Sequence, residues 1–533
     1  MAHSGRWAAR KDLFEISMRI SNNNQLRLSV IISYIQMAAA IVISIVFTPY
    51  ALKTLGDNEY GLLQTANSTV AMLSVLMLGF NSSYIRYYAR YKQAGDQEAI
   101  YKLNGLFLML FCILGSLVLG CGLFLAGNLE LVFDEGLTAQ EYATGRILLI
   151  ITTVTLALSF LRVVFANIIS AHERYVFLKG VAMIESVGGP LLNFAVLSFG
   201  LRSVAIMTVS LIMGVVVFLL YAYYAIRVLK QKFIFRNMEK GLLGSLFRFT
   251  GFIAIHLIVD QVDNQVDKVL LARFCGTAVV AVYAIGINFS TYYTQFSTAI
   301  SGIFTPRVHK MVISTEYDPA LQRRELTAFF TKVGRMQFLL LALIASGFVV
   351  FGQQFLTLWL GPGYTESYHV ALLCMIPSTV HLIQNVGIEI QRAENLHHYR
   401  SIVYGMVAVF NVAVTIYLCQ IWGAVGAALG TAMASILGHG ILMNVLYHKK
   451  LNIDVIVFWK NILRQCVGMI PAFLVGFAVA KWIAIESWLA LLGCVAVYMA
   501  VYLASVFTLA LNEEEKEVCK LLVQKFCPRG ERT

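Results

Sequence analysis

Charged residues are scarce in this sequence. They make up 13% of its 533 residues, whereas a water-soluble domain carries roughly a quarter. Proline is rare too, with 8 residues, while 59% of the chain is hydrophobic. No polar connection is long enough to bury a hydrophobic core of its own. These shortages exclude most classes of soluble enzyme and indicate one integral membrane body.

Motifs that carry catalysis or bind cofactors are also missing. The nine cysteines are scattered without a C-x-x-C pair, which argues against a zinc site or a disulfide framework. We find no glycine-rich phosphate loop, metal-ligand spacing or nucleophile elbow. No predicted outer connection exceeds about 20 residues, whereas membrane polymerases and glycosyl ligases usually place catalysis on a large outer loop. We therefore expect no enzyme, no cofactor, no metal site and no self-contained ATP-driven pump.

What the chain has instead is about fourteen apolar stretches, each able to supply the roughly 20 residues that a transmembrane helix requires. The predicted fold is all-α, a polytopic membrane protein with two six-helix lobes and two C-terminal helices. We place the fourteen spans at 28–48, 62–85, 103–126, 147–169, 180–199, 203–226, 249–272, 279–303, 333–352, 369–390, 401–421, 424–446, 465–480 and 488–510.

The basic residues divide unevenly between the two faces of this arrangement. About 34 of the 41 Lys and Arg residues fall on the side that both tails share, against about 5 on the opposite side. Because cytoplasmic loops carry the excess of Lys and Arg, both termini are predicted to be cytoplasmic and the number of spans to be even. The net charge of +12 thus indicates topology and attraction to anionic lipid headgroups, rather than nucleic-acid binding.

One of the two longest inner connections, 227–248, is strongly basic, lies near the middle of the chain and predicts a division into lobes. A weak internal repeat supports it. Residues 48–68 and 270–292 both read as a helix end, a glycine-containing outer turn, an aromatic-small pair and a polar helix. The predicted parts are a basic cytoplasmic segment at 1–27 without a cleavable signal peptide, an N-lobe at 28–226, a basic linker at 227–248, a C-lobe at 249–446, two further spans at 447–510 and a cytoplasmic tail at 511–533.

Three stretches resemble one known family. Residues 55–61 (LGDNEYG) resemble the outer turn after the first helix of polysaccharide flippases, 79–96 their first cytoplasmic loop, and 265–284 their seventh helix and its turn. The family is the O-antigen-type polysaccharide flippases of the multidrug/oligosaccharidyl-lipid/polysaccharide (MOP) exporter superfamily. The resemblance implies a multi-pass protein of the bacterial cytoplasmic membrane that exports an undecaprenyl-pyrophosphate-linked glycan by alternating access. It also implies membrane lipids, and a polysaccharide polymerase or glycosyltransferase, as partners.

The seventh predicted span carries an acidic stripe. His256, Asp260, Asp263 and Asp267 fall within about 60° of one another along about 16 Å of helix. Like charges at these spacings repel, so at least one carboxyl is expected to hold a proton near neutral pH. We interpret the stripe as a site that couples transport to a gradient of H⁺ or Na⁺. The alternative is a solvated helix face that pairs with neighbouring helices.

Cationic side chains within or at the ends of spans are candidates for binding pyrophosphate, because the arginine fork holds phosphate bidentately. Structural alternatives remain for the three arginines of this set. Arg162 and Glu185 could form a purely structural pair, and the same holds for Arg392 with Glu389. The candidate substrate-binding cations are Arg86, Arg162, Lys268 and Arg392, and Arg86 would otherwise anchor its span at the inner face.

The eighth predicted span is unusually polar. Asn288 and Tyr292 are among its polar residues. These polar residues either form hydrogen bonds to other helices or line a sugar-binding cavity. His381 and His439 are expected to be buried rather than to relay protons. Two other functions fit the same fold: a lipid II flippase of peptidoglycan synthesis, and a cation-coupled multidrug exporter of the same superfamily. The exporter would be expected to have acidic, aromatic cavities with few arginines.

Overall fold

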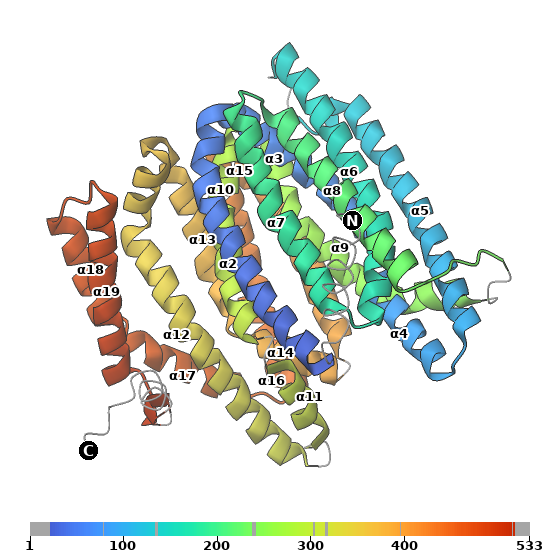
Figure 1. Ribbon diagram of the computed structural model, residues 1–533. Helices are drawn as coiled ribbons and strands as arrows, with labels where there is room; N and C mark the ends of the chain where they lie inside the picture. The colour runs from blue at the N-terminus through green and yellow to red at the C-terminus, as the bar shows by residue number, and fades with distance from the viewer. Residues whose placement is uncertain are drawn as a thin grey trace, which may run out of the picture. The chain divides into compact units, whose positions relative to one another are not determined.

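The computed structural model describes residues 22–517, apart from 78, 134–136, 237–240, 302–303, 315–317, 395 and 514. Within these ranges the secondary structure is entirely helical, and no strand is present (Figure 1). The chain divides into two compact units, Met1–Ala281 and Val282–Thr533. The lobe boundaries predicted at 28–226 and 249–446 stay a prediction.

The first unit contains eight α-helices, three short helical segments and the first turn of a ninth α-helix among its described residues. They are α2 (Asn22–Leu55), α3 (Asp57–Met72), η1 (Leu73–Met77), α4 (Phe80–Gln93), α5 (Gln97–Gly127), η2 (Leu129–Leu131), α6 (Ala139–Ala171), α7 (Tyr175–Ser198), α8 (Ser203–Tyr223), η3 (Tyr224–Val228), α9 (Leu242–Phe274) and the first turn of α10 (Thr277–Ser301).

The second unit continues with the remainder of α10 and the following elements. They are α11 (Thr305–Ser314), α12 (Pro319–Leu360), η5 (Pro362–Tyr364), α13 (Thr365–Leu382), α14 (Asn385–Ala393), α15 (His397–Ser435), η6 (Ile436–Leu442), α16 (Met443–Lys450), α17 (Val455–Val467), α18 (Ile470–Trp482) and α19 (Trp488–Leu509).

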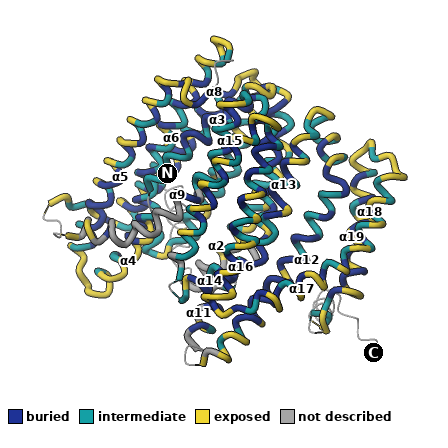
Figure 2. Tube along the Cα trace, turned by 180° about the vertical axis from the view of Figure 1, so that it is seen from behind, coloured by how far each residue is buried: buried dark blue, intermediate teal, exposed yellow. Residues whose placement is uncertain are grey.

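The predicted multi-pass helical fold is confirmed, but not the number of its spans. Nine helices among the described residues are long and apolar enough to cross a membrane, or up to eleven if two bent helix pairs each count as one span. The polar helices α9 and α10 are not among them. Large apolar side chains such as Val42, Leu474 and Leu489 are exposed, as expected of lipid-facing surface. Figure 2 shows exposed and buried residues alternating along individual helices.

Glycines form the corresponding turns in both copies of the proposed repeat. Gly56, between α2 and α3, has φ 79°, and Gly276, between α9 and α10, has φ 87°, a region of backbone conformation that other residues rarely adopt. Gly61 lets α3 approach the start of α10, since a Cβ there would lie 1.8 Å from the carbonyl oxygen of Thr277. Gly61, the last glycine of the LGDNEYG run, is therefore explained by the close packing of α3 against the start of α10.

The first part of the basic linker lies against the first unit. The Ile234 amide donates a hydrogen bond of 3.0 Å to the carbonyl of Tyr101, and a Cβ on Gly105 would lie 2.2 Å from the carbonyl oxygen of Ile234. Asn104 donates to the Lys232 carbonyl at 3.2 Å. Residues 231–235 are therefore fixed along α5 by backbone contacts that depend on a glycine and a buried amide.

Candidate functional site

The acidic stripe of α9 has one deeply buried member among its described side chains. Asp267 is 2% exposed, and Asp263 is partly buried. The side chains of His256 and Asp260 lie outside the described residues. A buried carboxylate requires hydrogen bonds or a counter-charge, so Asp267 occupies a position where gain or loss of a proton would change the local energy strongly.

Helix α9 packs against α3, η1 and α4 within the first unit. Gln261, on the polar side of α9, donates a 2.7 Å hydrogen bond to the carbonyl of Ala71 at the end of α3. That contact lies beside the break where α3 gives way to η1 and Gly79 adopts φ 68°. The helix of the predicted second span, 62–85, is thus interrupted. On α9, the candidate cation Lys268 is partly buried.

Arg162 of α6 and Glu185 of α7 form the ion pair that the sequence suggested. Nη1 of Arg162 lies 2.6 Å from Oε1 of Glu185, and the two side chains are 27% and 37% exposed. The pairing is confirmed, whereas contact of Arg162 with a substrate stays a prediction. Arg86, on α4, is exposed, in keeping with either an anchor or an accessible cation.

A buried polar network near Arg86 could not be predicted from the sequence. The Tyr84 hydroxyl donates to the Asn104 side chain at 2.6 Å, and Asn104 donates to Gln231 at 3.3 Å. Gln231 and Tyr88 each contact the His172 ring, at 3.3 and 3.1 Å. Burial lowers the pKa of His172, although the hydrogen bond to the Ile168 carbonyl acts in the opposite direction. The neutral ring therefore links Gln231 and Tyr88.

In the second unit, the polar residues of α10 divide between packing and exposure. The Tyr293 hydroxyl bonds to Thr379 at 2.6 Å, and the Ser297 hydroxyl donates to the Leu382 carbonyl at 3.1 Å. Both residues are buried and fasten α10 to the region around α13. Asn288 and Tyr292 are partly exposed. These two residues stay the candidates for contact with sugars.

At the end of α14, Arg392 pairs with Glu389 at 2.7 Å while its side chain stays 55% exposed. Burial raises the pKa of the following acid, Glu394, to about 7. The rings of His381 and His439 lie 4.5 Å apart, and the His439 ring bonds to the Tyr404 hydroxyl at 3.2 Å. The two histidines form one side-chain cluster.

The sequence-predicted site residues therefore fall in both units. The first holds Arg86, Arg162, Asp263, Asp267 and Lys268, and the second holds Asn288, Tyr292 and Arg392. Among the described side chains no group of three or more His, Cys, Asp or Glu residues could hold a metal ion. The described candidate residues offer charge, hydrogen-bonding groups and carboxyl groups that can exchange a proton.

Comparisons with known proteins place this arrangement in context. Residues 27–312 match the family described as polysaccharide biosynthesis protein. The chain is 23% identical to the uncharacterized membrane protein EpsK of Bacillus subtilis (strain 168), over 90% of this chain and 94% of that protein. It is 21% identical to the probable low-salt glycan biosynthesis flippase Agl15 of Haloferax volcanii, over 62% and 73% of the two chains.

A solved structure with a similar fold is the lipid II flippase MurJ in an inward closed conformation. It matches with a TM-score of 0.65 at 14% sequence identity, over 90% of this chain and 97% of that chain. At this level of identity the likeness concerns the fold alone.

Proposed function

The chain belongs to the polysaccharide biosynthesis protein family, as its sequence resemblance predicted, and from this premise we propose that it is a membrane flippase. Its substrate would be an undecaprenyl-pyrophosphate-linked oligosaccharide, carried across the bacterial cytoplasmic membrane. The observation that carries the proposal is the family match over residues 27–312. The relative Agl15, whose name describes a glycan biosynthesis flippase, supports the same substrate class.

We propose fourteen spans with both termini in the cytoplasm. The segment Tyr399–Lys450 has 52 residues, about 78 Å if straight, which is more than twice the hydrocarbon thickness. Within it, Trp422 and Gly423 leave the helical conformation, so the segment has a point at which it can turn and cross twice. The two bent helix pairs bring the candidate spans of the described chain to eleven, and a division of Tyr399–Lys450 adds one more. If α9 and α10 also cross the membrane despite their polarity, the total is fourteen. The buried Asp267 supports this treatment of α9.

In this proposal the lobes at 28–226 and 249–446 alternate access to the substrate, with 227–248 as their linker. Arg86, Arg162, Lys268 and Arg392 would bind the pyrophosphate, and Asn288 and Tyr292 the sugars. The acids of α9 would couple the cycle to H⁺ or Na⁺, because protonation of a buried carboxyl changes which neighbours it tolerates. A transporter of this kind performs no covalent chemistry on the glycan.

Depletion of the protein in its host tests the substrate class. We expect an undecaprenyl-linked oligosaccharide to accumulate, measured by mass spectrometry of lipid extracts, and export to recover when the wild-type chain is restored. Accumulation of lipid II instead would support the peptidoglycan function. A multidrug exporter would change drug susceptibility without accumulation of either lipid, and that result would reject the glycan proposal.

A further inference from the structure

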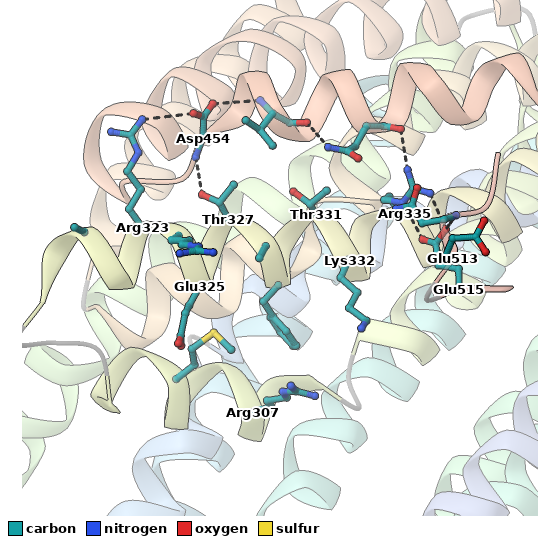
Figure 3. A pocket seen from close by; sticks show the side chains of 18 residues that line it. Arg307, Arg323, Glu325, Thr327, Thr331, Lys332, Arg335, Asp454, Glu513 and Glu515 are labelled. Carbon is teal, nitrogen blue, oxygen red and sulfur yellow. Dashed lines mark hydrogen bonds and ion pairs between the residues drawn. The ribbon is translucent and has the colours of Figure 1, made fainter. Parts of the chain in front are cut away.

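The second unit contains a large cavity with many charged lining residues, and none of the predicted transport residues lines it. It has a volume of about 1000 Å³ and lies along the first half of α12, bordered by α11, by α17 and by the chain that follows α19 (Figure 3). Its charged lining residues are Arg307, Arg323, Arg324, Glu325, Lys332, Arg335, Asp454, Glu513 and Glu515.

The length of α12 puts this cavity near the edge of the membrane. The candidate span Ala320–Leu360 has 41 residues, about twice what the hydrocarbon core requires. The charged residues of α12 lie in its first half, up to Arg335, and the rest of the helix is uncharged and mostly apolar. That first half therefore extends into the headgroup region, where a cavity meets both lipid phosphates and water.

Most carboxylates that line the cavity already form hydrogen bonds or ion pairs within the protein. Asp454 accepts hydrogen bonds from the amides of Ile456 and Val457 at the start of α17 and lies 3.8 Å from Arg323. Glu515 is held by Arg335 at 2.7 Å, and Glu513 by Lys516 at 3.0 Å. Glu325 points from α12 toward α11 in Figure 3. The negative charge of the wall is thus largely compensated by neighbours.

Two cations of the wall, unlike Arg323 and Arg335, are not held by a described carboxylate. Arg307 packs over the Phe329 ring at 5.1 Å, and neither Arg307 nor Arg324 forms an ion pair with a carboxylate among the described residues. Thr331 adds a second, independent observation. It is 8% exposed, and its hydroxyl has no hydrogen-bond partner within the described part of the chain. A buried hydroxyl without a hydrogen-bond partner lowers the stability of the protein. A ligand in the cavity that accepts a hydrogen bond from Thr331 would remove this cost.

We propose that this cavity binds a phosphate-bearing headgroup. Arg307, Arg324 and Lys332 supply the positive charge, and the Thr331 hydroxyl donates to a phosphate oxygen. Arginine forks and hydroxyls are the groups that hold phosphate best, and clustered cations at the membrane edge attract anionic lipids. The site is separate from the residues proposed to carry the transported glycan, and its occupant would fasten α11 to α12.

The test is binding of fluorescent phosphatidylglycerol to the purified full-length protein in detergent, with phosphatidylcholine as the comparison lipid. We expect Arg307→Gln/Arg324→Gln to weaken phosphatidylglycerol binding about 25-fold, since each surface cation contributes about fivefold, or about 1 kcal/mol. Thr331→Val should weaken it about fivefold without lowering the melting temperature. Arg464→Gln is the matched control, because Arg464 is exposed on α17 and does not line the cavity.

Inorganic pyrophosphate separates the two sources of phosphate. Displacement of the lipid by millimolar pyrophosphate in the wild type, lost in the arginine variant, would support the site with a soluble ligand. No displacement would support the lipid. The proposal is overturned if phosphatidylglycerol binds no better than phosphatidylcholine and pyrophosphate does not bind. It is also overturned if Arg464→Gln loses as much affinity as Arg307→Gln/Arg324→Gln. Arg324→Lys, which keeps the charge, should lose less than Arg324→Gln.

Discussion

Glu515→Gln should destabilise the protein by about 3 kcal/mol. Arg335, on α12, is 2% exposed, and its partner Glu515 is 16% exposed. Both carboxylate oxygens of Glu515 accept hydrogen bonds from the guanidinium, at 2.8 and 2.7 Å. Removing one partner of a buried ion pair costs about 3–5 kcal/mol. We expect the lower end because Arg335 also donates to the carbonyls of Asn461 and Ala510 at 3.3 and 3.0 Å.

The matched control lies two residues away. Glu513 pairs with Lys516 at 3.0 Å but is 89% exposed, so Glu513→Gln should cost about 0–1 kcal/mol. Both variants are compared with the wild type by urea unfolding in detergent, followed by tryptophan fluorescence. Equal stability of Glu515→Gln and Glu513→Gln would refute the account of this pair. Arg335→Met/Glu515→Leu, which removes both charges, should recover much of the loss.

The pH dependence of this pair has a defined sign. Burial by itself would raise the pKa of Glu515, but the hydrogen bonds from Arg335 and the Asn512 amide outweigh it, and the pKa is lowered. The pair therefore stabilises the protein fully above the ordinary Glu pKa of about 4.3. That contribution is lost as the pH falls through the lowered pKa of the folded state, and Glu515→Gln should not show this loss.

Three further predictions concern charge and topology. Arg162→Ala should weaken transport of an anionic substrate, whereas Arg162→Ala/Glu185→Ala would restore it if the 2.6 Å pair is structural only; the assay is export by cells with matched protein levels. The pKa of Glu394 is raised to about 7, so its contribution to stability is present below about pH 4.3 and is lost as the pH rises toward 7. Thermal unfolding at several pH values should show this decline in the wild type and not in Glu394→Gln. Cysteines introduced at Asn128 and Lys230 into a cysteine-free chain should react from outside and inside the cell, respectively; the reverse labelling would contradict the proposed topology.

The architecture was largely predictable because a membrane admits few solutions. Backbone groups in hydrocarbon must be satisfied internally, so apolar stretches of sufficient length predict helices. The ion pair of Arg162 with Glu185 followed from placing both charges near the inner ends of consecutive spans. The internal repeat predicted turns at Gly56 and Gly276. Both glycines have positive φ values, as such turns require.

The remaining contacts join residues that are distant along the chain, and no local pattern announces them. Arg335 and Glu515 are 180 positions apart, and Asn104 and Gln231 are 127 apart. The one available signal for Asn104 was a polar amide at the edge of an apolar span. The Lys and Arg residues between 304 and 332 contribute to the charge asymmetry that indicates topology, but the amino-acid composition of this stretch does not reveal the cavity between α11, α12 and α17.

Reconstitution tests the central claim most directly. The purified protein in vesicles should move a fluorescent undecaprenyl-pyrophosphate-linked oligosaccharide between leaflets, and an imposed H⁺ or Na⁺ gradient should accelerate the movement. Asp263→Asn/Asp267→Asn, inserted at the wild-type level, should lose that acceleration. Absence of lipid movement by the wild-type protein would contradict the flippase assignment, and undiminished gradient-driven movement by the double variant would contradict the role of the α9 carboxyls.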